Sequence, residues 1–103
     1  MVIDNTLMEL AKIRAKELDK WYSHETDTFT NACENIGGGL TTIRSGFIAW
    51  RNSTGHYNNM VRQSNKYFAY AAYHKDGKMS NPFYGVQLFW SEDAKSAYEA
   101  TMS

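Results

Sequence analysis

Three side chains in this sequence could bind a metal ion or move a proton, and each stands beside the expected end of a structural element. His24 follows one helical segment, Glu34 precedes a glycine run, and His56 follows a second helical segment. Side chains at element ends often converge on a cleft. Two neutral imidazoles and a carboxylate could hold a divalent cation with an open position, as catalytic zinc sites do. Spacing alone favours the alternative that these are ordinary loop and cap residues, because no local metal-ligand spacing occurs.

Motifs that would point to other chemistry are absent from the sequence. The glycines at 37–39 are followed by leucine rather than by the Lys-Ser/Thr of a phosphate-binding loop, and their spacing does not fit a dinucleotide site. There is no Gly-x-Ser-x-Gly, Cys-x-x-Cys or His-Glu-x-x-His motif. The candidate chemistry therefore rests on the two histidines and Glu34.

The elements that must position these side chains can be predicted from hydrophobic spacing. Residues 7–22 carry apolar side chains at three-to-four spacing, which indicates a helix, and Thr6 with Glu9 matches a capping box. Residues 42–52 have the same spacing, and Gly55 is a natural stop for this second helix. Each helix has one tryptophan that we expect to pack against the core, Trp21 and Trp50.

The second half of the chain has the texture of a hairpin followed by a helix. Residues 66–74 alternate aromatic and small side chains and residues 83–90 are apolar, so both are predicted as strands, joined through a turn at Asp76-Gly77 and a loop at Asn81-Pro82. Residues 91–101 are predicted as a last helix capped by Ser91. The order predicts an α+β fold, with helices packed on a small antiparallel sheet.

Composition and charge restrict the class of protein. A chain of 103 residues has room for one domain. Eleven basic residues balance eleven acidic ones, which argues against a nucleic-acid partner held by bulk charge. No apolar run is long enough for a membrane span. The single cysteine, Cys33, cannot form an internal disulfide. If residues 33–36 are extended, Cys33 and Glu34 point to opposite faces, and we then expect Cys33 to be a small buried group rather than a nucleophile paired with His24.

Five short pieces of the sequence carry a family resemblance. In chain order they are Leu7-x-x-Leu10-Ala11-x-x-Arg14-Ala15-x-Glu17, Tyr22-Ser23-His24, Glu34-Asn35-Ile36, Trp50-x-x-Ser53-x-Gly55-His56-x-x-Asn59 and Gln87-Leu88-Phe89. Together they resemble the CAP superfamily of cysteine-rich secretory proteins, antigen 5 and plant pathogenesis-related class 1 proteins, and most closely its compact bacterial, SCP-like branch. The resemblance covers about residues 7–90 of a single domain spanning 1–103.

The resemblance implies an α-β-α sandwich around a small antiparallel sheet and an extracellular protein, although no signal peptide is visible at the start of this chain. It also implies a cleft with two histidines and two acids, in which some members bind zinc through the histidines. His24 and His56 take the histidine positions and Glu34 takes the first acid. The position of the second acid is Ser53, and this weakens acid–base catalysis. The residues expected to support the cleft are Asn35, Ser53 and Asn59.

Three functions follow from the resemblance. The first is a non-enzymatic module that binds a small ligand or a protein partner in the His24/His56 cleft, with zinc as the candidate cofactor. The second is a metal-assisted hydrolase with Glu34 as the base. The third is a lipid- or sterol-binding protein, which needs an apolar groove that the sequence does not reveal.

The resemblance also predicts an unusual edge to the domain. Relatives usually have a further helix before the segment that starts near Leu7, and that helix would cover one face of the sheet. Residues 91–103 lie beyond the usual end of the family. We therefore expect this extra helix, or a second copy of the chain in a homo-oligomer, to provide the missing cover.

Overall fold

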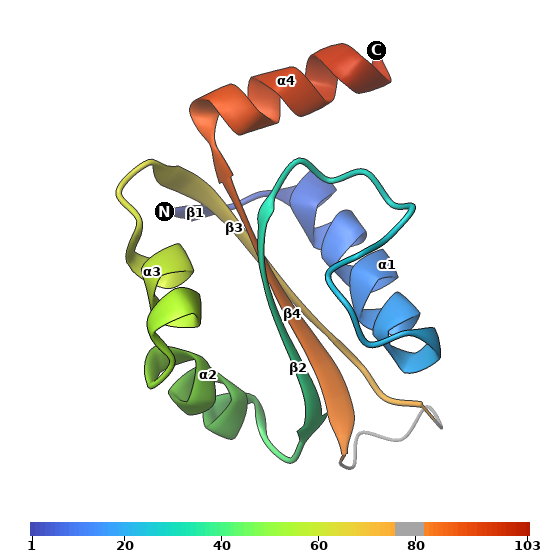
Figure 1. The fold of residues 1–103 in the computed structure, drawn as a ribbon. Helices are drawn as coiled ribbons and strands as arrows, with labels where there is room; N and C mark the ends of the chain where they lie inside the picture. The colour runs from blue at the N-terminus through green and yellow to red at the C-terminus, as the bar shows by residue number, and fades with distance from the viewer. Residues whose placement is uncertain (76–81) are drawn as a thin grey trace.

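The computed structural model describes residues 1–75 and 82–103, and within them the chain forms four strands and four helices around one sheet (Figure 1). The elements, in chain order, are β1 (Val2–Ile3), α1 (Asn5–Lys20), β2 (Cys33–Leu40), α2 (Ile43–Arg51), α3 (Thr54–Val61), β3 (Asn65–Tyr73), β4 (Phe83–Ser91) and α4 (Glu92–Met102). The predicted turn at Asp76-Gly77 lies outside the described residues, as does Asn81 of the predicted loop.

The sheet has the strand order β1-β3-β4-β2. Strands β3 and β4 are antiparallel neighbours at its centre, β2 pairs antiparallel with β4, and the short β1 pairs parallel with β3. The predicted antiparallel sheet is therefore present, with one parallel pair added at its edge.

Helices cover both faces of this sheet (Figure 1). The apolar side of α1 packs on β3 and β4, and on the other face Phe47 and Trp50 of α2 pack against Tyr70 of β3. This arrangement confirms the predicted α-β-α sandwich. The buried apolar residues at the interface between α1 and the sheet include Leu7, Leu10, Ala11, Ala15 and Leu18 from the helix and Ala69, Val86 and Leu88 from the strands.

Strand β2 was not expected, because glycine disfavours strands and three glycines follow one another here. In the structure the missing side chain of Gly37 leaves space for neighbouring side chains. A Cβ on Gly37 would lie 3.1 Å from the Leu40 side chain and 3.4 Å from that of Trp50. Gly39 has a φ of 62°, which a side chain would disfavour, at the point where the β2–β4 register shifts.

The outer edge of β2 is capped by side chains from the helices beside it. The indole Nε1 of Trp50 donates to the carbonyl of Ile36 at 3.0 Å, and Nδ2 of Asn59 donates to the carbonyl of Glu34 at 3.4 Å. These bonds satisfy outward-facing carbonyls that would otherwise be open to another strand. Trp50 is 3 % exposed, which confirms it as a packing anchor.

Two predictions about the first helix are wrong. The N-cap of α1 is Asp4, whose Oδ1 accepts a hydrogen bond from the Leu7 amide at 2.9 Å, so Thr6 lies inside the helix. The helix ends at Lys20, and the chain turns to extended backbone at Trp21. Trp21 is consequently 60 % exposed and does not anchor the helix.

The second helical segment also differs from the expected one. Helix α2 ends at Arg51, and a further helix, α3, begins at Thr54. Gly55 therefore lies inside α3 rather than ending α2. The short break between the helices changes the chain direction and brings α3 beside β2.

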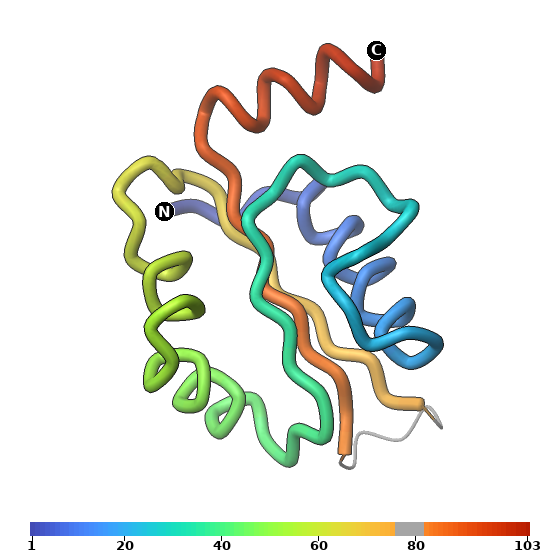
Figure 2. The backbone as a smooth tube through the Cα atoms, in the orientation of Figure 1, coloured from blue at the N-terminus to red at the C-terminus, as the bar shows by residue number. Residues whose placement is uncertain are grey.

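The last helix, α4, has the predicted cap, because Oγ of Ser91 accepts from the Ala94 amide at 3.0 Å. The helix lies at one end of the sheet, with the C-terminus at its tip (Figure 2). It is held there by Tyr98, whose ring packs on Trp90 and Phe29. Among the described residues, every helix is too short or too polar to cross a membrane.

Candidate functional site

The candidate site is organised around Arg14, which lies on the buried side of α1 with its side chain 1 % exposed. Its Nε donates to Oε2 of Glu34 at 2.7 Å, and its Nη2 donates to Oε1 of the same carboxylate at 2.8 Å. This is the two-point geometry that makes arginine–carboxylate pairs strong. Arg14 also donates to Oε1 of Glu17 at 3.1 Å and to the carbonyl of Ser23 at 2.9 Å.

The charges around Arg14 stabilise one another. The hydrogen bonds to Glu34 raise the pKa of Arg14 above its ordinary value, against the opposing effect of burial, so the guanidinium remains charged. For Glu17, burial acts to raise the pKa, but hydrogen bonds from Thr26, Thr28 and Arg14 outweigh it and the pKa is lowered. Glu17 and Glu34 therefore both accept hydrogen bonds from one buried cation.

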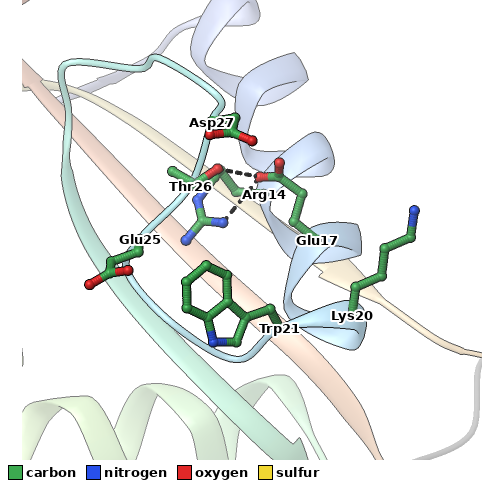
Figure 3. A pocket seen from close by; sticks show the side chains of 7 residues that line it. All are labelled: Arg14, Glu17, Lys20, Trp21, Glu25, Thr26 and Asp27. Carbon is green, nitrogen blue, oxygen red and sulfur yellow. Dashed lines mark hydrogen bonds and ion pairs between the residues drawn. The ribbon is translucent and has the colours of Figure 1, made fainter.

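Glu17 attaches the loop after α1 to the helix. The hydroxyl of Thr26 donates to Oε1 of Glu17 at 2.8 Å, and the hydroxyl of Thr28 donates to Oε2 at 2.8 Å. In Figure 3 dashed lines join Glu17 to both Arg14 and Thr26. The loop that carries His24 is thus fixed through Glu17.

The structure brings His24 and Glu34 together. Nδ1 of His24 lies 3.0 Å from Oε1 of Glu34, with the histidine side chain 60 % exposed and the carboxylate 11 % exposed. A hollow of about 220 Å³ adjoins them. The residues that line this hollow, called the His24 hollow below, are His24, Thr26, Thr30, Ala32 and Glu34.

His56 is held by different partners. It lies on α3, its Nδ1 is 2.9 Å from Oγ of Ser53, and its backbone carbonyl accepts from Nδ2 of Asn35 at 3.1 Å. In the described part of the chain no side chain hydrogen-bonds both imidazoles, and His56 does not line the His24 hollow. Ser53, which stands in the second acid position, therefore interacts with His56 and not with Glu34.

The two asparagines belong to a buried amide network between the sheet and α3. Asn35 is fully buried in β2, where its Nδ2 donates to Oε1 of Gln87 at 2.9 Å and its Oδ1 accepts from Asn59 at 2.9 Å. Asn65 donates to the carbonyl of Asn59 at 2.9 Å. These bonds fix α3, and with it His56, against β2.

Cys33 lies on the strand face opposite Glu34, as predicted, but it is only half-buried. Its Sγ accepts a hydrogen bond from Nη1 of Arg62 at 3.5 Å, whereas the neighbouring Glu34 contacts Arg14 of α1. The thiol is therefore next to a cation on the α3 side of the sheet.

The donor set does not fit a zinc ion well. Among the described residues, no three His, Cys, Asp or Glu side chains are grouped so that they could hold a metal. Both oxygens of Glu34 already accept from Arg14, and that positive charge would oppose a nearby cation. A zinc site needs at least three protein ligands. Zinc binding stays a prediction.

A second hollow of about 380 Å³ lies between the C-terminal half of α1 and the loop that follows it (Figure 3). Its walls are strongly charged, and the exposed indole of Trp21 forms one side. The lining residues are Arg14, Glu17, Lys20, Trp21, Glu25, Thr26 and Asp27.

The family model of the cysteine-rich secretory protein family, CAP, matches residues 1–90. The chain belongs to the CAP family. Among solved structures, an outer surface protein from Borrelia burgdorferi superposes on this CAP domain with a TM-score of 0.71 and 18 % identity, covering 89 % of this chain and 78 % of the other. At that identity the likeness shows the CAP fold alone. A comparison with curated proteins gave no match.

Sequence reasoning missed the role of three polar residues in this CAP domain: Arg14, Glu17 and Gln87. Arg14 had a readable signal, because it falls on the same side of the helix as Leu7 and Leu18, where a charge must have a partner. Glu17 and Gln87 stand in the pieces that carry the family resemblance, but those pieces do not reveal their partners, which lie in other segments of the chain.

Proposed function

We propose that this CAP domain is a non-enzymatic binding module and that its ligand site is the His24 hollow. The observation that carries the proposal is the state of Glu34, whose two oxygens both accept hydrogen bonds from the buried Arg14. A general base needs a lone pair directed at the substrate proton, and this carboxylate is instead engaged as a structural anion. Ser53, in the second acid position, supplies no further base.

The chemistry of the hollow favours a small polar group. Its walls carry an imidazole, two hydroxyls and a carboxylate whose charge is balanced by Arg14. About 220 Å³ is below the usual size of a pocket for a whole drug-sized ligand. The occupant is therefore a small polar molecule or one polar side chain of a protein partner. The CAP family, together with a similar protein that is an outer surface protein, supports a secreted or surface location.

An NMR screen with small polar fragments, such as imidazole, acetamide and monosaccharides, tests the site. We expect shifts at His24, Thr26 and Thr30, and their loss in His24→Ala. His56→Ala is the matched control and should bind as the wild type does. Fragments that move His56 alone, or that bind His24→Ala unchanged, would contradict the proposal. Zinc binding is tested separately by calorimetry of zinc titrated into the wild type and into His24→Ala/His56→Ala. Equal, negligible heats for the two proteins would contradict zinc binding.

The alternative that this domain is a hydrolase is tested by replacing Glu34, the proposed base. We expect wild type and Glu34→Gln to give the same background hydrolysis across a library of peptide and ester substrates. Circular dichroism must first show that Glu34→Gln is folded, since the change breaks a buried ion pair. Activity above background in wild type that is lost in folded Glu34→Gln would replace the binding proposal with the enzymatic one.

A specific observation favours lipid binding as a second candidate. An apolar groove of about 250 Å³ lies on the sheet face beside α2 and α3, and by the same size criterion it has room for only part of a lipid, such as a segment of an acyl chain. Native mass spectrometry of protein purified without detergent should then show a lipid adduct. An unmodified mass, both before and after incubation with palmitate or cholesterol, would exclude it. The lining residues are Met1, Phe47, Met60, Phe68, Gln87 and Phe89.

A further inference from the structure

The outer surface of α2 and α3 combines exposed apolar side chains with two arginines. A hollow of about 280 Å³ lies between the helices. Tyr57 is 43 % exposed and Val61 is 51 % exposed, so apolar area on this surface remains in water. An exposed apolar patch rimmed by charge is typical of a docking surface. The lining residues, called the α2–α3 patch below, are Arg44, Phe47, Ile48, Arg51, Tyr57, Met60 and Val61.

The charge around this patch is of one sign. Residues 35–75 contain no Asp or Glu and five Lys or Arg, although the whole chain is neutral. Arg44 and Arg51 are exposed, and neither forms an ion pair within the described residues. An occupant that matches the α2–α3 patch must therefore be acidic and must also offer apolar contacts.

Helix α4 of the same chain has these properties. It lies beyond residue 90, where the family match ends, and Tyr98 is its only buried residue. Its exposed side includes the carboxylates of Asp93 and Glu99, and Met102 is 60 % exposed. Eleven residues make a marginal helix in isolation, so additional packing would stabilise it.

We propose that α4 of one copy of the chain docks on the α2–α3 patch of a second copy. Within one molecule α4 lies at the end of the sheet, apart from α2 and α3 (Figure 1), so the contact is made between molecules. A helix laid in an apolar groove is a common recognition mode, and here the two arginines beside the groove would pair with the carboxylates of α4. Reciprocal exchange of the two helices would close a symmetric dimer. The surface differs from the His24 hollow, and the proposal does not depend on the proposed function.

Sedimentation velocity of the full chain over a wide concentration range tests the proposal. We expect concentration-dependent association that weakens at high salt, because screening reduces attraction between exposed charges. Arg44→Glu/Arg51→Glu and Asp93→Lys/Glu99→Lys should each weaken association by about tenfold or more, since like charges then face each other. Lys16→Glu/Lys20→Glu, on the exposed side of α1, is the matched control and should associate like the wild type.

Mixing the two reversed variants gives the sharpest readout. Each should be monomeric alone, whereas the mixture should associate because every contact in it again joins opposite charges. Circular dichroism confirms that each variant is folded. A wild type that is monomeric throughout, a patch variant that associates normally, or a mixture that stays monomeric would overturn the proposal. Binding of the monomeric wild type to phosphatidylglycerol vesicles would assign the patch to a membrane surface instead.

Discussion

Arg14 is a buried cation, and the stability of the domain depends on its being paired. Arg14→Met keeps much of the side-chain volume but leaves Glu34, 11 % exposed, without its partner. Removing one member of a buried ion pair typically costs about 3–5 kcal/mol. We expect a loss of this size in the free energy of unfolding, measured by urea denaturation.

A double variant separates the ion pair from packing. In Arg14→Met/Glu34→Met the Glu34 charge is removed together with its partner, and Glu17 keeps its hydrogen bonds from Thr26 and Thr28. Much of the lost stability should therefore return, because apolar replacements of whole buried pairs are often neutral. A double variant that is as unstable as the sum of both single changes would show that the pair itself does not determine the loss.

The loop that follows α1 should respond to pH, because it is attached to the helix through Glu17. Its lowered pKa means that its contribution to stability is complete above the ordinary value of 4.5 and is lost as the pH falls through the lower, folded-state pKa. Protonation weakens the bonds from Thr26 and Thr28, so the protection of amides in that loop, measured against their intrinsic exchange rate at the same pH, should fall at acid pH. Glu17→Gln should show fast exchange already at neutral pH. Wild type and variant with the same pH profile would contradict this role.

At the residue scale, the sequence pattern identified part of the candidate site. The family resemblance placed His24 and Glu34 in one cleft, and the two are in contact. It could not show that Glu34 is held by Arg14, because a motif gives residue types but not which hydrogen bonds they form. The link between His56 and Ser53 depends on a helix, α3, that was not expected.

At the scale of elements, Asp4 joins three parts of the molecule. It caps α1, lies directly after β1, and its Oδ2 accepts from Nζ of Lys95 on α4 at 2.7 Å. Asp4→Ala should cost about 1 kcal/mol from the lost cap alone, with a further loss from the released contact to α4. Thermal or urea unfolding measures both. Thr6→Ala is the control and should cost little. An equal loss of stability in Thr6→Ala would support the capping box at Thr6 and Glu9 that the sequence predicts.

The elements that sequence reasoning missed are those whose formation depends on tertiary contacts. Strand β2 contains three glycines, yet it is paired along β4 and capped by Trp50. Helix α3 is short and has no side-chain cap at Ser53, so local signals for it are weak. By contrast α1 and β4 have long apolar patterns, and these were predicted from spacing alone. Local propensity gives way where distant residues supply the stabilising contacts.

At the scale of the whole molecule, charge is distributed unevenly among the layers of the fold. The layer formed by α2 and α3 is basic, whereas all the acids lie in the segments before residue 35 or after residue 75. Net neutrality therefore hides a separation of charge across the molecule. A net charge near zero already favours association, and the separated charges allow the basic surface of one copy to attract an acidic surface of another.

The role of α4 in the single molecule can be separated from its role between molecules. Tyr98, 9 % exposed, packs on Trp90 and Phe29, and Tyr98→Ala should cost about 3 kcal/mol, since truncating a buried aromatic ring removes a large apolar area and leaves a cavity. Deleting residues 92–103 should cost at least as much in urea unfolding, because it also uncovers Trp90. Asp93→Lys/Glu99→Lys should cost less, about 1 kcal/mol, because Asp93 lies in the first turn of α4 where an acid is favoured, while strongly reducing association. If deletion leaves stability unaltered, α4 is not part of the domain core, and its contacts with β4 contribute nothing to folding.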